Sequence, residues 1–159
     1  MKLFFIIFVP LIINLYPLNK LNSELIPKKR LFDTSLDFNY KSGEVLTLFI
    51  ADDVFEKEVG LMGVKKLHPN HGMLFVFDPQ EKVNFWMKNT LIPLDIIFIK
   101  NDRIIEIVEN ALPCALDKCP LIGSKEKVNF VIELNSGRAK DLGFKIGDNI
   151  FLDKKINIK

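Results

Sequence analysis

Short apolar and alternating runs, separated by turn residues, fill the last two-thirds of the chain. Runs of strand-forming side chains occupy residues 45–51 and 73–77, and two more, 94–100 and 103–109, flank Asn101-Asp102. Asn and Asp tolerate the left-handed backbone of a tight turn, so this pair predicts a β-hairpin.

The C-terminal third contains a run with clean alternation. The pattern predicts a strand at 128–134 with Val128, Phe130, Ile132 and Leu134 facing inward, and Asn129, Val131 and Glu133 facing outward. A last strand is predicted at 149–152.

Two short helices interrupt these strands. Asp53 with Glu56 resembles a capping box, and it precedes an apolar stripe that ends at Met62. A second helix is predicted from Ser136 to Leu142, where a glycine ends it. Six to seven short strands, two short helices and no β-α-β alternation predict a mainly β fold, an antiparallel β-sandwich or barrel.

The segment 83–95 carries the strongest functional signal. If 83–88 is a strand, Trp86 shares its polar face with Asn84 and Lys88, opposite the apolar Val83, Phe85 and Met87. A tryptophan on a polar face is unusual and indicates a contact surface. The candidate ligand-binding residues are therefore Trp86, Lys88, Asn89, Thr90 and Asp95.

A purely structural interpretation of this segment remains open. Asn89 and Thr90 can form a turn by bonding their own backbone. Lys88 can pair with Asp95 or Glu133 across neighbouring strands. In that case the polar residues only build the end of a strand.

The functional interpretation is a shallow pocket. Trp86 would supply a flat apolar face, Lys88 an anchor for an anion or carbonyl, and Asn89 and Thr90 hydrogen bonds. A catalyst would need more, with Asp95 as general base and Lys88 as electrostatic stabiliser. No serine or cysteine beside a histidine is evident, and Glu106 and Glu133 carry no distinguishing pattern.

The N-terminal segment differs from the rest of the chain. Lys2 precedes the apolar run 3–13, which is the pattern of a secretory signal. We predict a signal peptide or N-terminal anchor at 1–22, a linker at 23–43 and a β domain at 44–153. The location would be periplasmic or secreted, with attachment to the inner membrane if the segment stays uncleaved.

Cys114 and Cys119 are the only cysteines, and prolines bracket the segment that contains them. In an exported protein such a pair predicts one local disulfide. A redox couple, half of a metal site and free thiols are the alternatives, but a separation of five residues does not resemble thioredoxin-type pairs.

Metals, cofactors and nucleic acid find little support. Met62, Met73 and Met87, near His71, could hold Cu(I), yet each occupies a position that a core fills with an apolar side chain. We therefore expect no metal and no cofactor. The net charge is only +2, and no basic stripe or run of like charges indicates nucleic-acid binding.

Several motifs together resemble the DUF192 family, small bacterial and archaeal proteins of unknown function that are often exported. They are Gly60-Leu61-Met62, Gly72-Met73-Leu74-Phe75-Val76-Phe77, Phe85-Trp86-Met87-Lys88-Asn89-Thr90, Pro93-Leu94-Asp95, Val131-Ile132-Glu133-Leu134-Asn135 with Gly137, and Gly147-Asp148. The resemblance covers roughly 44–152 and implies a β-sandwich-like fold and export, but no activity. Family members usually carry arginine at the position of Lys57 and just after Gly-Leu-Met.

Three classes of function follow. The leading one is an exported module that binds a polar small molecule or saccharide-like ligand in the cell envelope. The alternatives are a hydrolase-type enzyme that uses the Lys88/Asp95 cluster and a structural partner of the envelope. Whether the protein is an enzyme, and its oligomeric state, stay open at this point.

Overall fold

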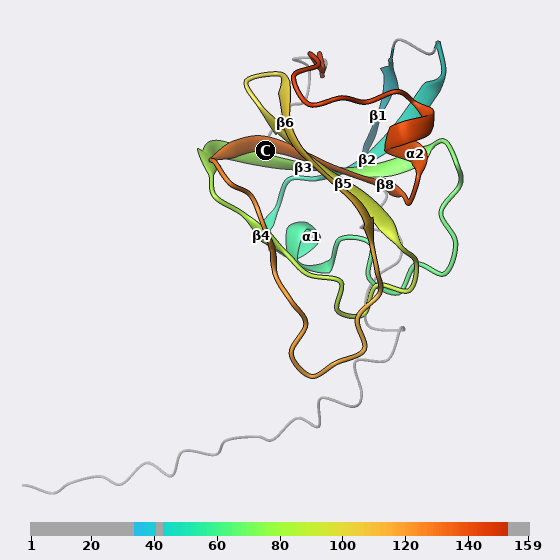
Figure 1. The fold of residues 1–159 in the computed structure, drawn as a ribbon, viewed down its shortest axis with the longest axis vertical. Coiled ribbons are helices and arrows are strands. Elements are labelled where there is room, and N and C mark those ends of the chain that lie inside the picture. The colour runs from blue at the N-terminus through green and yellow to red at the C-terminus, as the bar shows by residue number, and fades with distance from the viewer. Residues whose placement is uncertain (1–33, 41–42, 153–159) are drawn as a thin grey trace, which may run out of the picture.

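A computed structural model describes residues 34–40 and 43–152. Its centre is one six-stranded sheet, which is twisted (Figure 1). In spatial order the strands are β1 (Ser35–Asn39), β2 (Val45–Ala51), β3 (His71–Glu81), β8 (Val128–Asn135), β5 (Leu94–Lys100) and β6 (Arg103–Ala111). A second, two-stranded sheet pairs β4 (Asn84–Phe85) with β7 (Ile122–Gly123). The helices are α1 (Val54–Val59) and α2 (Arg138–Asp141).

The prediction of a mainly β fold with two short helices is confirmed, but its finer form is wrong. The large sheet is mixed, because β2 runs parallel to β3 while its other strand pairs are antiparallel. It does not close into a barrel. A parallel pair needs a crossover connection, and residues 52–70, which contain α1, provide it. The expected absence of any β-α-β unit is therefore wrong at this place.

The sheet begins before Glu44. Strand β1 lies inside the range 23–43 that the sequence predicts as a linker, and it pairs with β2 from Ser35↔Phe49 to Asn39↔Val45. Phe38 and Tyr40 of this segment are buried, and the Tyr40 hydroxyl donates to Asp148 Oδ2 over 2.6 Å. The predicted signal segment 1–22 lies outside the described residues.

The C-terminal segment does not form the predicted strand at 149–152. It contributes one isolated bridge, between Asn149 and Arg103 of β6. Ile150 and Leu152 are nevertheless buried, so the segment closes the core as an irregular coil.

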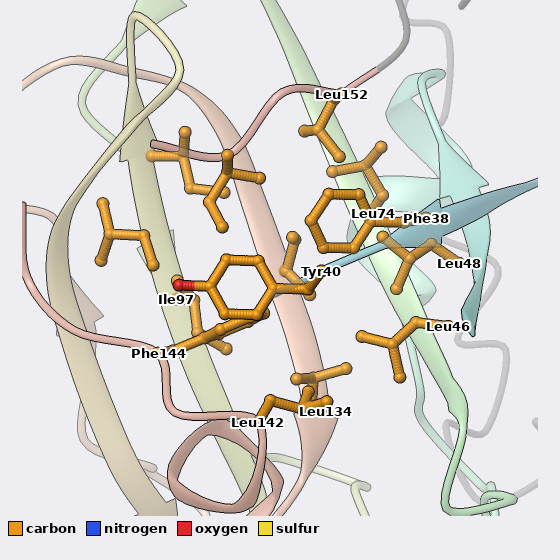
Figure 2. Packing of buried hydrophobic residues seen from close by; sticks show 14 of the residues in the cluster. Phe38, Tyr40, Leu46, Leu48, Leu74, Ile97, Leu134, Leu142, Phe144 and Leu152 are labelled. Atoms are coloured by element: carbon orange, nitrogen blue, oxygen red, sulfur yellow. The ribbon is translucent and has the colours of Figure 1, made fainter. Parts of the chain in front are cut away.

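Two hydrophobic cores lie on opposite faces of the large sheet. On the first, which we call the α2 face, residues of β1, β2, β3, β5 and β8 pack against Leu142 and Phe144, which follow α2 (Figure 2). On the second, the α1 face, Phe75, Phe98 and Val131 pack against Leu61 and Leu67 of the crossover. Among the described residues no helix has the length and apolar character needed to cross a membrane.

The central strands are therefore buried on both faces, as strands flanked by other strands and covered on two sides must be. This overturns the expected outward orientation of Val131 and Glu133 in β8. Val131 is fully buried and Glu133 is 6% exposed, because both lie on the α1 face under the crossover. An alternating pattern identifies the two faces of a strand but not which face meets solvent.

Local signals in the sequence are confirmed at two places. The capping box forms at α1, where Asp53 Oδ1 accepts from the Glu56 amide over 2.7 Å and Glu56 Oε2 accepts from the Asp53 amide over 3.4 Å. The hairpin between β5 and β6 turns at Asn101 and Asp102, with φ of 50° and 61°. The capping box fixes the start of α1, and the turn fixes the ends of β5 and β6.

Candidate functional site

The segment 83–88 keeps its predicted alternation without forming a full strand. Only Asn84 and Phe85 pair as β4, while Val83 and Met87 are buried and Trp86 is 42% exposed. Phe85 packs edge-on against Phe75, with ring centroids 4.9 Å apart. Because Phe85 points down onto the sheet, Trp86 is held on the outer side of the segment.

Lys88 contacts the neighbouring tryptophan and no acid. Its ammonium nitrogen lies 5.6 Å from the centre of the Trp86 ring, within reach of a cation–π interaction. It forms no ion pair with any residue that the structure describes. The predicted pairing of Lys88 with Asp95 or Glu133 is therefore wrong.

Asn89 and Thr90 form the predicted turn. Asn89 has a left-handed φ of 58°, and the Thr90 amide donates to the Met87 carbonyl over 3.3 Å. The Asn89 carbonyl accepts from the Gly63 amide over 2.9 Å, which ties the turn to the crossover. The Thr90 side chain is buried, whereas Asn89 stays exposed.

Asp95 does not join these residues. It pairs in register with Leu134, whose side chain lies in the core of the α2 face, so Asp95 also points there. Its Oδ1 accepts from the Asn110 amide and its Oδ2 from the Ala139 amide, each over 3.0 Å. The sequence placed Asp95 with Trp86 because they are close along the chain, but the sheet separates them.

A cavity of about 320 Å³ lies beside Trp86 on the α1 face. Its walls are residues 57–62 of α1 and the following turn, Phe75 and Phe77 of β3, and residues 81–86. Thr90 and Glu133 complete the lining. Of the five candidate ligand-binding residues, Trp86 and Thr90 border this cavity, and Lys88, Asn89 and Asp95 are not part of its lining.

Local backbone geometry opens the cavity at Gly60. This residue has φ of 47°, a backbone conformation that residues other than glycine rarely adopt. A Cβ atom here would also lie 3.1 Å from the Phe75 ring. Glycine thus lets the chain leave α1 close above β3, which places residues 60–62 against the cavity.

Glu133 is the functional candidate that sequence reasoning missed. It lies in β8 between Met73 of β3 and Ile96 of β5, both fully buried. Its carboxyl group forms no hydrogen bond or ion pair with any described residue, although it is only 6% exposed. Burial raises the pKa of the Glu133 carboxyl from 4.5 to about 8, so at neutral pH the group is mostly protonated.

A buried acid without a partner, bordering a cavity, is characteristic of binding and catalytic sites. The available signal was the lone charge of Glu133 inside the apolar run Val131–Leu134. Alternation alone does not show that this charge lies on a covered face. The protonated acid can donate one hydrogen bond and accept others, while the ring of Trp86 can cover an apolar surface.

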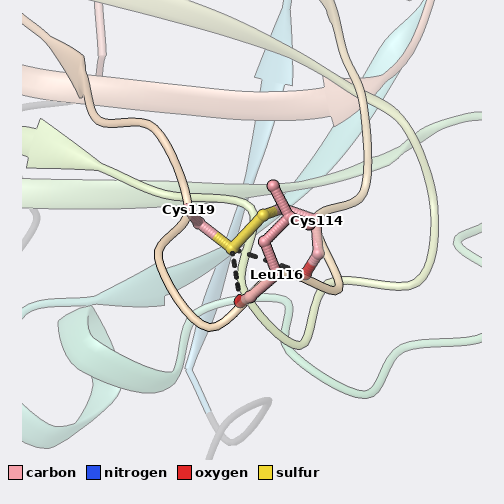
Figure 3. The surroundings of a disulfide bond; sticks show 3 residues. All are labelled: Cys114, Leu116 and Cys119. Carbon is pink, nitrogen blue, oxygen red and sulfur yellow. Dashed lines mark hydrogen bonds between the residues drawn. A yellow bond between two sulfur atoms is a disulfide. The ribbon is translucent and has the colours of Figure 1, made fainter.

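The predicted disulfide is present between Cys114 and Cys119 (Figure 3). It closes a tight loop in which Cys119 Sγ lies 3.5 Å from the Leu116 carbonyl oxygen. The Cys114 amide donates to the Met87 carbonyl over 3.1 Å, and Cys114 forms a bridge with Lys88. The disulfide loop therefore supports the segment that carries Trp86.

The methionines occupy apolar positions. Met73 and Met87 are buried in the core of the α1 face, and Met62 borders the cavity. Within the described part of the chain, no group of three or more His, Cys, Asp or Glu side chains is arranged to hold a metal ion.

Comparisons with known proteins give a family and a fold. Residues 38–152 match the model of DUF192, described as "Uncharacterized ACR". A structure from Sinorhizobium meliloti 1021, described as a "putative transcription regulator", is 42% identical with a TM-score of 0.64 and covers 72% of this chain and 89% of its own.

A protein of unknown function from Novosphingobium aromaticivorans is 34% identical with a TM-score of 0.66, over 75% of this chain and 84% of its own. No curated protein matches this chain. Because the family match spans nearly all of the described residues, this chain belongs to the DUF192 family.

Proposed function

We propose that this protein binds a polar small molecule, such as a saccharide-like ligand, in the cavity beside Trp86. The observation that carries the proposal is Glu133, a buried carboxyl group that borders the cavity and has no partner among the described residues. The Glu133 oxygens are not among the fully enclosed polar atoms of the described residues, so a ligand in the cavity can reach them.

The shape of the cavity supports a small ligand. Its volume of about 320 Å³ is at the lower end of the range for ligand pockets, roughly 300–1,000 Å³. Trp86 offers a ring at the edge, and Thr90 and Asn84 add uncharged polar side chains to a lining that also contains aromatic, aliphatic and charged residues. A flat ring beside hydrogen-bonding groups suits a polar ring compound.

The hydrolase-type alternative loses its basis. It required Lys88 and Asp95 to act together, but the Asp95 side chain lies on the opposite face of the sheet and accepts two backbone N–H groups. Binding without chemistry needs only the groups that border the cavity. The third alternative, a structural partner of the envelope, is tested below as the competing outcome.

The proposed compartment is the periplasm or the exterior of the cell. The Cys114–Cys119 disulfide supports it, since such bonds persist in oxidising compartments. Nucleic acid is not part of the proposal, because a net charge of +2 gives no strong attraction to phosphates. The description "putative transcription regulator" belongs to the Sinorhizobium meliloti relative, and we do not carry it over to this chain.

Ligand-observed NMR with uncharged monosaccharides and small polar ring compounds tests the proposal. We expect at least one of these compounds to bind the full chain. The Trp86→Ala variant should bind it with an affinity at least tenfold lower. Phe151→Ala, which truncates another exposed aromatic ring, should leave binding unchanged. If no compound binds and Trp86→Ala instead removes protein crosslinks in intact cells, the structural-partner function replaces this one.

A further inference from the structure

The surroundings of Glu133 determine which ligand chemistry the cavity can accept. The carboxyl is flanked on its own sheet by Met73 and Ile96, and Phe75 and Leu61 also lie on this face. None of these side chains can neutralise a carboxylate. An acid in such a place is more stable with its proton than without it, unless a ligand brings a positive charge.

The charges around the cavity do not favour a cationic ligand. Lys57 and Glu58 of α1 face it from one side, and Glu81 and Lys82 from the other. These two positive and two negative side chains add up to no net charge. Lys57 is half-buried, with its ammonium 5.0 Å from the Phe77 ring, whereas both acids are exposed.

The Trp86 ring, which could attract an organic cation, already has a cation over it. The Lys88 ammonium lies over the Trp86 ring at 5.6 Å, so a second cation at that face would meet its repulsion. Asp95, the second buried acid of the sheet, points to the α2 face and cannot share a proton with Glu133. Glu106 of β6, in register with Phe98, is paired with Lys125.

We propose that Glu133 recognises its ligand as a carboxylic acid, donating its proton in a hydrogen bond to an uncharged oxygen acceptor, such as a carbonyl, ether or ring hydroxyl. This rests on the function proposed above and names the ligand class of that cavity. The carboxyl proton is not transferred, and no bond is made or broken. Uncharged sugars and amides fit this rule, and amines do not.

The protonation state of Glu133 can be measured without a ligand. In the full chain with ¹³C-labelled glutamate carboxyls, the Glu133 signal, assigned by its loss in Glu133→Gln, should titrate near pH 8. A midpoint below pH 6 would overturn the inference, since the group would then bind as a carboxylate at neutral pH. Glu109→Gln, at an exposed position of β6, should leave the Glu133 signal unchanged and controls for the assignment.

The ligand class is tested with matched probes, N-acetylglucosamine against glucosamine, and a set of small amides against the corresponding amines. At pH 6.5 the uncharged member of each pair should bind more tightly. Between pH 7 and pH 9 its Kd should rise about tenfold, because the protonated fraction falls to about one in eleven. Glu133→Gln keeps an N–H donor without a titration, so it should bind with an affinity independent of pH.

Two outcomes separate the claims. If the amines bind preferentially, with an affinity that rises with pH and is lost in Glu133→Gln, the cavity is a binding site but the acid acts as a carboxylate, and this inference fails. If no probe binds wild-type protein better than a folded Glu133→Leu variant, the proposed function fails with it. Circular dichroism of each variant confirms the fold first.

Discussion

Asp95 and Glu133 are two buried acids on adjacent strands, one residue out of register with each other. Asp95 pairs with Leu134 and Glu133 pairs with Ile96, so their side chains leave the sheet on opposite faces. Asp95 accepts two backbone N–H groups, whereas Glu133 accepts none and borders a cavity. Equal burial thus leaves the two acids in different surroundings, because the backbone satisfies Asp95 and Glu133 faces the cavity.

The largest expected effect comes from removing the structural acid. Asp95→Ala leaves the buried amide of Ala139 and the partly buried amide of Asn110 without their acceptor, which should lower the free energy of unfolding by about 3 kcal/mol. Urea unfolding followed by tryptophan fluorescence measures the change. Asp95→Asn keeps one acceptor and should lose about half as much. A loss below about 1 kcal/mol for alanine would contradict the structural role.

The second prediction concerns the effect of pH on Glu133. The unfolded chain releases the Glu133 proton near pH 4.5, but the folded chain keeps it until about pH 8. The folded state thus binds more protons in this window, and the free energy of unfolding falls as pH rises. From pH 5 to pH 7.5 the contribution is on the order of 3 kcal/mol.

Glu133→Gln should remove this decrease, so the variant becomes more stable than wild type at pH 7.5 and nearly equal to it at pH 5. Urea unfolding at both pH values checks the sign. A variant equally destabilised at both values would show instead that Glu133 is a structural acid like Asp95.

The third prediction addresses what holds the cavity's outer wall. Replacing Cys114 and Cys119 by serine removes the constraint of a short loop and should lower the free energy of unfolding by about 2 kcal/mol. The loop is attached to Met87, next to Trp86, so the variant should also lose ligand affinity. Unchanged stability after reduction of the wild type would refute the supporting role.

The smallest effect on stability is expected at Trp86. The side chain is 42% exposed, so Trp86→Ala should change the free energy of unfolding by less than about 1 kcal/mol. Ligand affinity should fall at least tenfold in the same variant. Thermal denaturation by circular dichroism gives the first quantity and ligand titration the second. Equal affinity would remove Trp86 from the site and leave Glu133 as its only tested contact.

The sequence predicted those features that depend on neighbouring residues. Asp53 and Glu56 form their capping box, Asn101 and Asp102 turn the hairpin, and the cysteines pair. Each is decided within a few residues of chain. The side chains of Val83–Met87 alternate as expected for the same reason.

The rest depended on contacts between distant segments. No short sequence pattern indicates that β2 pairs in parallel with β3, or that Ser35–Asn39 joins the sheet. In β5 and β8, apolar residues occupy both faces, so alternation could not show that Asp95 and Glu133 point opposite ways. Proximity of Asp95 to Trp86 along the chain therefore does not give proximity in space.

The crossover between β2 and β3 has a consequence for how such proteins can diverge. Residues 57–62 of this connection line the cavity, yet they belong to neither strand of the pair that it joins. Insertions and exchanges there can reshape the cavity without altering strand pairing. Glu133, by contrast, is fixed in β8 at the centre of the sheet. The lining from the crossover can thus vary while the part of the lining that comes from β8 stays fixed.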